Sequence, residues 1–434
     1  MKLALSLLVL VSSIVAAQQP TDAGFKPISM ADAVMLAQKN APAAVQALGA
    51  VENAEGVVST TYNQFFPTLT GTLGHSQGAG QVLDNSGKLI SKISQPQYST
   101  GLSTSLTLFD GGKRVYDLRA RRADLTSAEV SESATKFNLA LQVKQQYYVI
   151  LAARENESAA RYALDLANQQ LSASIARVRA GAVIISDSLR SFLAVNTAQL
   201  NVLTAQNNVR NASLALTRLV ESPVPVTAAA ADTSTFTITP IDSAAVVALA
   251  LDGPGVREAK AALNAASAGV KSARTSYFPT VTASLRYGGN GYDIAYGIGG
   301  GKLAYSNTLN INASYNIWDG RNRAVALDHA QVTVSADEAL LRDAGLFAQQ
   351  NILLQISTLR NAEARIRIQA LSVQAAQEDL RVQQQRYNLG SSTLLEVTTS
   401  QNALNSARQA LIQARFDYRT ARAQIEAIIG RDLQ

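Results

Sequence analysis

Residues 305–320, YSNTLNINASYNIWDG, decide the fold of this chain. From Leu309 to Ile317, apolar or aromatic residues alternate with asparagine and serine, and an Asp-Gly pair follows at Asp319 and Gly320. Alternation with a period of two predicts a β-strand with one apolar face and one hydroxyl- or amide-rich face. Such a strand suits a wall with lipid on one side and water on the other.

The same plan occurs twice in the sequence. Residues 317–320 (IWDG) correspond to residues 108–111 (LFDG). A glycine lies 71 residues after the aspartate of each copy, at Gly181 and Gly390, so that a single offset of 209 residues aligns the two copies. We infer an internal duplication.

Each copy is expected to contain two strands, between a Phe-Pro pair and the Asp-Gly pair. Their apolar positions are Leu69, Leu73, Leu102, Leu106 and Leu108 in the first copy, and Val281, Ala283, Leu285, Tyr287, Leu309 and Ile311 in the second. Polar, glycine-rich loops are expected to join the strands at residues 75–97 and 288–302. Four strands are too few to close a barrel, which needs about 8, so several chains would have to share it. The pattern alone also fits a soluble antiparallel sheet with one wet face.

A long segment without proline follows each Asp-Gly pair, at residues 111–180 and 320–389. As a helix, roughly 70 residues would span about 105 Å, far more than a globular core can use. Apolar residues recur at seven-residue spacing: Val143, Ile150, Leu164, Leu171 and Val178 in the first copy, with Glu157 interrupting, and Ile352, Leu359, Ile366, Val373, Leu380 and Tyr387 in the second. A sustained heptad repeat predicts left-handed coiled coils.

Two helical hairpins are predicted, with turns at Gly181 and Gly390, because glycine readily adopts the left-handed conformation in which helices commonly end. The shorter returning helices carry their own heptad positions: Val195, Val202, Val209 and Leu216, then Leu404, Leu411, Tyr418 and Ile425. Between the copies, residues 221–255 contain four prolines and are expected to form a connector with short structure of its own.

The beginning of the chain predicts export. Residues 1–17 contain a lysine, an apolar run and then small residues, the pattern of a secretory signal peptide. No later segment approaches the roughly 18 consecutive apolar residues of a membrane-spanning helix. The sequence has no cysteine, so we expect no disulfide, thiolate metal site or lipid-anchored cysteine. The net charge of +6 is scattered rather than clustered, which argues against a nucleic-acid partner.

Catalytic motifs are missing from the sequence: it has no phosphate-binding loop, paired-histidine zinc motif or nucleophile elbow. The two histidines, His75 in a predicted loop and His329 in a predicted long helix, are too isolated to suggest a metal or catalytic site. We therefore expect no enzyme activity, metal or cofactor. Asp110 and Asp319, at the junctions from strand to helix, are predicted to be helix N-caps.

The signal peptide, the duplicated halves, the Phe-Pro pairs, the Asp-Gly pairs and the glycine at each hairpin tip together resemble the TolC-like outer-membrane efflux proteins. The resemblance covers essentially the whole mature chain. It implies a mostly α fold with a membrane β-barrel, in which a homotrimer forms one barrel in the outer membrane of a Gram-negative type cell and a long α-barrel in the periplasm. It also implies a passive exit duct of a tripartite efflux or type I secretion system. The implied partners are a periplasmic adaptor protein, an inner-membrane transporter and outer-membrane lipid.

The expected organisation follows from these signals. It comprises a signal peptide at 1–17, N-terminal helices at 18–64, the first two strands at 65–110, the first long hairpin at 111–220, an equatorial connector at 221–255, a helix at 256–276, the last two strands at 277–319 and the second long hairpin at 320–430.

The hairpin tips close the periplasmic end of the pore in the family that this chain resembles. The resemblance assigns the tip tyrosine to Tyr387, its partner carboxylate to Asp187 and the first acid of a constricting ring to Glu396. Ser392 and Thr399 depart from the family pattern, since they replace a tip arginine and a second ring acid. The gate is therefore expected to be less acidic and to have fewer links. Glu396 and Asp187 are equally well explained as helix-start carboxylates that favour the helix dipole.

Other classes of protein are also considered. A secreted coiled-coil scaffold or adhesin without a pore would place the alternating segments in a soluble sheet, which the lipid-compatible face of residues 305–317 disfavours. An adaptor protein would show one hairpin rather than two matched ones. The exported compound, the cognate pump and the choice among drug efflux, protein secretion and metal export are not indicated by the sequence.

Overall fold

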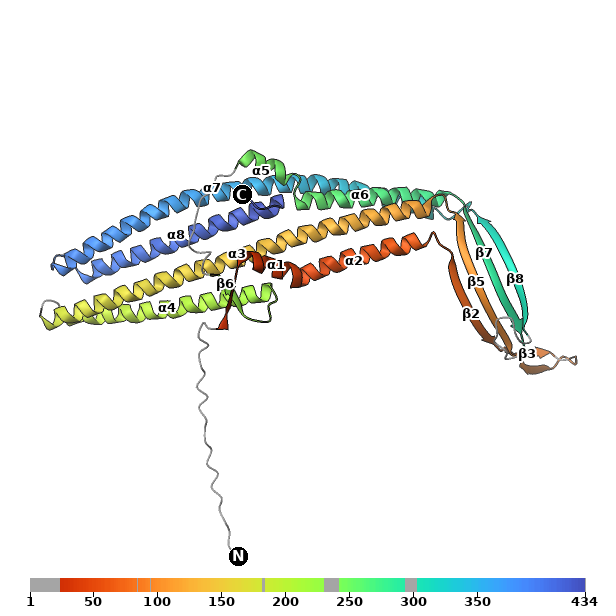
Figure 1. The fold of residues 1–434 in the computed structure, drawn as a ribbon, viewed down its shortest axis with the longest axis horizontal. Helices are drawn as coiled ribbons and strands as arrows, with labels where there is room; N and C mark the ends of the chain where they lie inside the picture. Colours follow the sequence, from red (N-terminus) through yellow and green to blue (C-terminus); the bar gives the residue numbers. More distant parts are fainter. Residues whose placement is uncertain are drawn as a thin grey trace, which may run out of the picture. The chain divides into compact units, whose positions relative to one another are not determined.

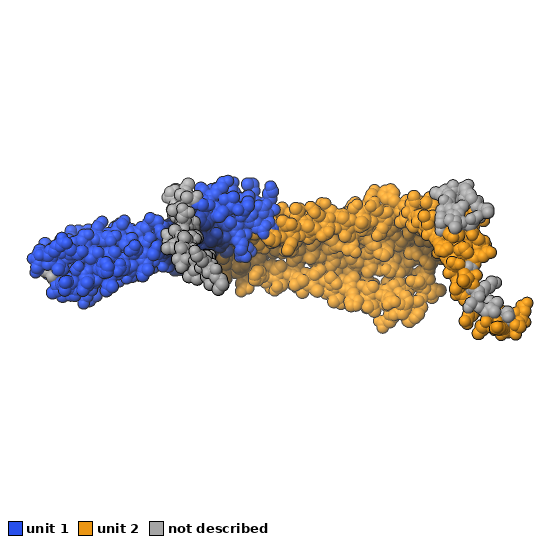
Figure 2. Space-filling view, turned by 90° about the horizontal axis from the view of Figure 1, so that it is seen from below, with its two compact units in different colours: residues 1–41, 142–238, 361–420 blue, residues 42–141, 239–360, 421–434 orange. Residues whose placement is uncertain are grey.

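The computed structural model describes residues 24–83, 85–93, 95–181, 184–229, 242–292 and 303–433. The signal peptide predicted at residues 1–17 lies outside the described residues. The chain divides into two compact units, coloured separately in Figure 2. Unit 1 comprises residues 1–41, 142–238 and 361–420, and unit 2 comprises residues 42–141, 239–360 and 421–434.

Long helices dominate the structure (Figure 1). In chain order the elements are β1 (Lys26–Ile28), α1 (Met30–Asn40), α2 (Pro42–Asn63), β2 (Thr68–Ser76), β3 (Ala79–Leu83), β4 (Leu89–Ile93), β5 (Gln97–Phe109), α3 (Lys113–Arg179), α4 (Ile185–Leu219), β6 (Val226–Ala228), α5 (Ser243–Ala250), α6 (Pro254–Arg274), η3 (Thr275–Tyr277), β7 (Thr280–Gly291), β8 (Ala304–Ser314), α7 (Asn322–Asn388) and α8 (Leu394–Ile429). Within unit 2, α2, α6 and the parts of α3 and α7 that belong to this unit lead to the same end of one sheet (Figure 1).

That sheet is antiparallel, with the strand order β2-β5-β7-β8. Its register gathers the apolar side chains on one face, because residues directly opposite each other point to the same side. The positions on this face include Leu69, Leu102, Leu106, Ala283, Leu285, Leu309 and Ile311, whereas Thr70, Ser103, Ser105, Ser284 and Asn310 belong to the other face. The two-faced sheet expected from the alternation is therefore present.

Two details of the strands differ from expectation. A β-bulge between Thr107 and Phe109 places Phe109 opposite Val281, so that Phe109 occupies the position on the apolar face that was predicted for Leu108. β8 ends at Ser314 instead of Ile317. Ser314 is paired with Thr280, the first residue of β7, and the preceding Pro279 has no N–H to extend the ladder.

The loop predicted at residues 75–97 was wrong in part, because it contains a second hairpin. β3 and β4 pair antiparallel through a turn in which Gly87 has a φ of 79°. His75, expected in that loop, lies in β2 opposite Tyr98, with the two ring centroids 4.8 Å apart. Polar residues interleaved in β3 and β4 obscured their β propensity.

The heptad residues form the interior of the helical hairpins. In the second copy Ile352, Leu359, Ile366, Leu380 and Tyr387 are buried. Val143 and Ile150 are fully buried in the first copy, and Val202, Leu216, Leu404, Tyr418 and Ile425 are buried in the returning helices. Packing along these heptads is what stabilises helices of this length, since helix propensity alone contributes little.

The connector docks onto α3 within unit 1. Its strand β6 pairs in parallel with β1. The Tyr147 hydroxyl, fully buried, donates to the Ile28 carbonyl (3.0 Å) and accepts from the Ala229 N–H (2.9 Å). Arg154 donates to the Ala228 carbonyl at 2.6 Å. The N-terminal segment predicted as helices thus also supplies a strand, which holds the connector in place.

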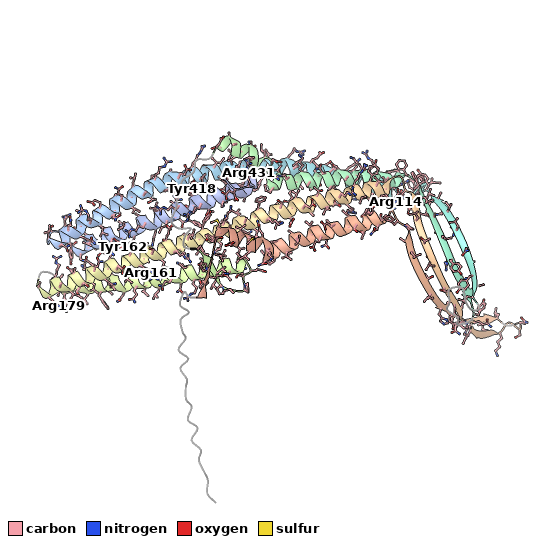
Figure 3. All side chains as sticks on the ribbon, viewed as in Figure 1. Arg114, Arg161, Tyr162, Arg179, Tyr418 and Arg431 are labelled. Carbon is pink, nitrogen blue, oxygen red and sulfur yellow. The ribbon has the colours of Figure 1, made fainter. Side chains whose placement is uncertain are left out.

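Both strand-to-helix junctions use the same side-chain arrangement. Asp110 accepts hydrogen bonds from the Arg114 backbone N–H (3.2 Å) and guanidinium (2.8 Å), and Asp319 accepts the same pair from Arg323 (both 2.9 Å). Each aspartate therefore satisfies an N–H of the first helical turn while pairing with an arginine one turn away. Figure 3 labels Arg114 at the start of α3, beside the sheet.

Candidate functional site at the hairpin tips

The tips of the two hairpins lie in unit 1, and each turns at a glycine in the left-handed region. Gly181 has a φ of 72° after α3, and Gly390 has a φ of 78° after α7. At the second tip the Gly390 N–H donates to the Tyr387 carbonyl (3.1 Å) and the Ser391 N–H to the Arg386 carbonyl (2.9 Å). These bonds satisfy carbonyls that the helix end would otherwise leave open.

Tyr387 is the central side chain of the second tip. It is 2% exposed and packs in a cluster with Leu380, Leu394, Val397 and Leu404. Its hydroxyl is buried without a hydrogen-bond partner among the described residues. A buried hydroxyl without a partner is uncommon in proteins.

Arg177, in the last turn of α3, joins the first hairpin to Tyr387. Its guanidinium carbon lies 4.3 Å from the ring centroid of Tyr387, and it donates to the Tyr387 backbone carbonyl at 2.5 Å. The arrangement combines a cation–π contact with a charge-assisted hydrogen bond. The sequence offered no pattern that singles out Arg177, which became visible only when the two hairpins were brought together.

Asp187 lies in the first turn of α4 and is partly exposed. Burial raises the pKa of Tyr387, the Arg177 charge opposes that rise, and the Asp187 carboxylate adds to it. Asp187 therefore acts on Tyr387 through its charge. The structure brings Tyr387 and Asp187 into one electrostatic environment, together with Arg177.

Glu396 completes a capping box at the start of α8. Its carboxylate accepts from the Thr393 backbone N–H (3.1 Å), and the Glu396 N–H donates to the Thr393 hydroxyl (3.4 Å). The Ser392 hydroxyl also donates to the same carboxylate, and these bonds, with the charge of Arg386, lower the pKa of Glu396. Glu396 is exposed and ionised at the tip.

The two positions that depart from the family pattern have local partners. Ser392 donates to the Gln383 side-chain oxygen at 3.2 Å as well as to Glu396. Thr399 is exposed, and its hydroxyl donates to the Leu395 carbonyl of its own helix at 2.8 Å. Ser392 thus links the end of α7 to the start of α8, whereas, among the described residues, the Thr399 hydroxyl bonds only within α8.

The fold agrees with a comparison against family models. The model described as "Outer membrane efflux protein" matches residues 33–221 and 247–431. The chain belongs to this family.

Individual relatives and solved structures are consistent with the outer membrane efflux family. The chain is 26% identical to the pyoverdine export outer membrane protein OpmQ of Pseudomonas aeruginosa over 348 residues, which cover 77% of this chain and 68% of OpmQ. It is 22% identical to the outer membrane protein TolC of Escherichia coli over 363 residues, covering 81% of this chain and 73% of TolC. The outer membrane protein VceC of Vibrio cholerae superposes with a TM-score of 0.75 at 16% identity, over 93% of this chain and 97% of VceC.

Membership of the outer membrane efflux family assigns the chain to the outer membrane as a passive channel of an efflux system, not as an enzyme. It gives no support to the coiled-coil scaffold considered above. Among the described residues, no group of three or more His, Asp or Glu side chains is placed to hold a metal ion. No helix in the described part of the chain is both long and apolar enough to cross a membrane.

Proposed function

We propose that three copies of this chain form one export duct, each contributing its four strands to a shared barrel. The observation that carries the proposal is the open sheet: among the described residues, β2 and β8 each pair on one side only. An unpaired edge is a template for another strand, and about 8 strands are the fewest that close a barrel. Pairing β8 of one copy with β2 of the next satisfies both edges.

The outward face of that barrel contacts lipid. Leu69, Leu73, Leu309 and Ile311 on the apolar face are between 67% and 75% exposed in the single chain. Apolar exposure on this scale suits the hydrocarbon region of a membrane. The opposite face, rich in serine, threonine and asparagine, lines a water-filled interior that is chemically permissive to cargo.

Neighbouring copies also pack through their helices. α4 presents an exposed apolar row with heptad-like spacing, formed by Ile185, Leu189, Leu193, Leu200 and Leu203, which are 52% to 70% exposed. A second apolar row on a coiled-coil helix requires another helix to cover it. In the trimer that helix belongs to the next copy, which closes the helices into a periplasmic barrel.

The hairpin tips form the periplasmic gate of this duct. Arg177 on Tyr387, with the charge of Asp187 nearby, joins the two hairpins, and three copies of Glu396 form a ring attractive to cations. Thr399 supplies no second acid, so Glu396 carries the charge of the constriction. A periplasmic adaptor protein and an energised inner-membrane transporter engage the tips, and the channel itself hydrolyses nothing.

Single-channel conductance in a planar bilayer tests the proposal. We expect small, cation-selective steps that a trivalent cation added on the periplasmic side blocks, and that lose their selectivity in Glu396→Gln. This variant keeps the capping box, because glutamine can replace glutamate at that position. If the mutation leaves the conductance steps and their selectivity unchanged, the proposed acidic ring is wrong but the proposed channel stands. Folded protein that never inserts would instead favour the scaffold.

A further inference from the structure

The two strand-to-helix junctions have unequal turns. Gly112 in the first copy and Arg321 in the second occupy equivalent positions, 209 residues apart, with φ values of 85° and 70°. Glycine adopts this left-handed conformation freely, whereas a side chain with a Cβ is strained there. The second copy therefore keeps an arginine at an energetic cost that glycine avoids. Retained strain of this kind is a reason to search for a function.

Arg321 differs from the neighbouring basic residues of these junctions in its ion pairing. In the first copy Lys113 is paired with Asp117 and Arg114 with Asp110. In the second copy Arg323 is paired with Asp319, and its guanidinium also lies over the Tyr277 ring. Arg321 is exposed, and although its carbonyl accepts from the Val325 N–H (3.0 Å), its guanidinium makes no hydrogen bond or ion pair with another described residue. Its charge is thus available to a partner outside the chain.

Two exposed apolar residues shortly precede Arg321 in the chain. Ile317 and Trp318 are 86% and 80% exposed, more than Leu108 and Phe109 at the equivalent positions, which are 52% and 47% exposed. Trp318 precedes Arg321 by three residues, so their backbones are at most about 11 Å apart. Tryptophan prefers the boundary between hydrocarbon and headgroups, where its ring is buried and its N–H remains hydrated.

The register of the sheet places further aromatic residues at this end. β2 and β7 begin here, at Thr68 and Thr280, while β5 and β8 end here. The residues flanking these four strand ends include Phe66, Phe109, Phe278 and Tyr315, all between 47% and 55% exposed. Exposed aromatic residues therefore flank the end of the sheet at which the chain leaves β8 and passes through Trp318 to Arg321.

We propose that Trp318 and Arg321 form a binding site for an anionic phospholipid, with the indole beside the acyl chain and the guanidinium on the headgroup phosphate. The inference rests on the proposed function, since it requires the sheet to cross the membrane. The chemical fit comes from the partners: a guanidinium is suited to the oxygens of a phosphate, and each basic side chain near a membrane surface attracts anionic lipid. The first copy, with Gly112 in its turn, has no such site.

Trp318 is the only tryptophan of the chain, so its fluorescence reports on this site alone. The full-length protein is reconstituted into phosphatidylcholine vesicles that contain the same mole fraction of either brominated phosphatidylglycerol or brominated phosphatidylcholine, because bromine quenches tryptophan on contact. We expect the anionic lipid to be enriched about fivefold at Trp318. Arg321→Gly should abolish the preference without loss of thermal stability, since it restores the residue of the first copy. Arg321→Lys should retain part of it.

A matched control removes an equal charge elsewhere. Arg342→Gln changes an exposed arginine further along α7 and should leave the preference intact. Equal quenching by both lipids in the unaltered protein would overturn the anionic site while leaving the membrane sheet in place. No quenching by either lipid, from protein that conducts ions, would mean that a neighbouring copy covers Trp318 and would also overturn it. Protein that neither conducts nor inserts would instead refute the proposed channel.

Discussion

The Arg177 guanidinium carbon lies 4.3 Å from the centroid of the Tyr387 ring, and Arg177 donates a 2.5 Å hydrogen bond to the backbone carbonyl of the same residue. The contact joins the end of α3 to the end of α7, and so links the two hairpins of one chain. The Tyr387 hydroxyl has no partner among the described residues. Two links are therefore distinguishable at the tip: the arginine contact, and the pairing of the Tyr387 hydroxyl with Asp187 that the family resemblance implies.

Arg177→Gln should loosen the tip, whereas Tyr387→Phe should not. The first change removes the cation–π contact, worth about 0.5–2 kcal/mol, and the charge on the hydrogen bond. The second removes only an unsatisfied hydroxyl, which is close to neutral. Single-channel recording should show larger or more frequent openings for Arg177→Gln alone. Arg179→Gln, in the same turn of α3, is the control. Opening in Tyr387→Phe but not in Arg177→Gln would assign the link to the hydroxyl and Asp187.

The lowered pKa of Glu396 predicts how cation selectivity depends on pH. Hydrogen bonds from Ser392 and Thr393 stabilise the ionised carboxylate. Its charge therefore persists as the pH falls to the ordinary glutamate value of 4.5 and is lost only below it. Ser392→Ala removes one of these bonds, raises the pKa and should move the loss of selectivity to higher pH. Reversal potentials in a salt gradient, measured from pH 7 downward, give the pH dependence of cation selectivity for the unaltered protein and for Ser392→Ala. If the two curves coincide, Ser392 does not set the charge of Glu396.

The sequence was sufficient to predict the repeated architecture because the features that determine it are periodic. Alternation from Leu309 to Ile317 predicted a two-faced strand, and the heptads ending at Tyr387 predicted which side of α7 is buried. Where periodicity failed, a local irregularity was responsible. The bulge at Leu108 and the missing N–H of Pro279 each break a pattern that the sequence continues.

The set of candidate functional residues at the hairpin tips was only partly predictable, since they come from four different helices. The family resemblance pointed to Tyr387, Asp187 and Glu396, but Arg177 lies 210 residues before Tyr387 and has no pattern of its own. The role of Glu396 in the capping box was partly foreseeable: Thr393 and Glu396 have the three-residue spacing of that motif. A cross-hairpin contact depends on three-dimensional packing that no spacing along one helix encodes.

Gly390→Ala should destabilise the second tip, by about 1–2 kcal/mol. Gly390 has a φ of 78° and open space where a Cβ would lie, so the cost is purely that of the backbone. Gly345→Ala is the matched control, because Gly345 also has open space but lies within α7, where alanine stabilises by roughly 0.5–1 kcal/mol. Thermal unfolding of both variants should therefore shift in opposite directions. Gly390→Asn should be milder than Gly390→Ala, since asparagine tolerates this conformation. Equal shifts for the two alanine variants would contradict the conclusion that the left-handed backbone of Gly390 determines the cost.

Asp110→Asn should destabilise the first junction in a way that depends on pH. Although burial alone would raise the pKa of Asp110, its hydrogen bonds and ion pair with Arg114 lower it below the ordinary 3.8. The carboxylate therefore contributes stability that is present above pH 3.8 and is lost as the pH falls through the lowered value. At pH 7 we expect a loss of about 1–2 kcal/mol. The difference between variant and unaltered protein should shrink at low pH, where the wild-type carboxyl is also neutral.

Asp319→Asn provides the internal comparison for this effect. Asp319 accepts the same two bonds from Arg323, but Asp110 also accepts one from the Gly112 N–H at 3.1 Å. The Asp319 variant should consequently unfold closer to the unaltered protein in thermal melts recorded at pH 7 and at pH 3. If both variants lose the same stability at both pH values, the aspartates act as neutral caps and their ion pairs contribute nothing measurable.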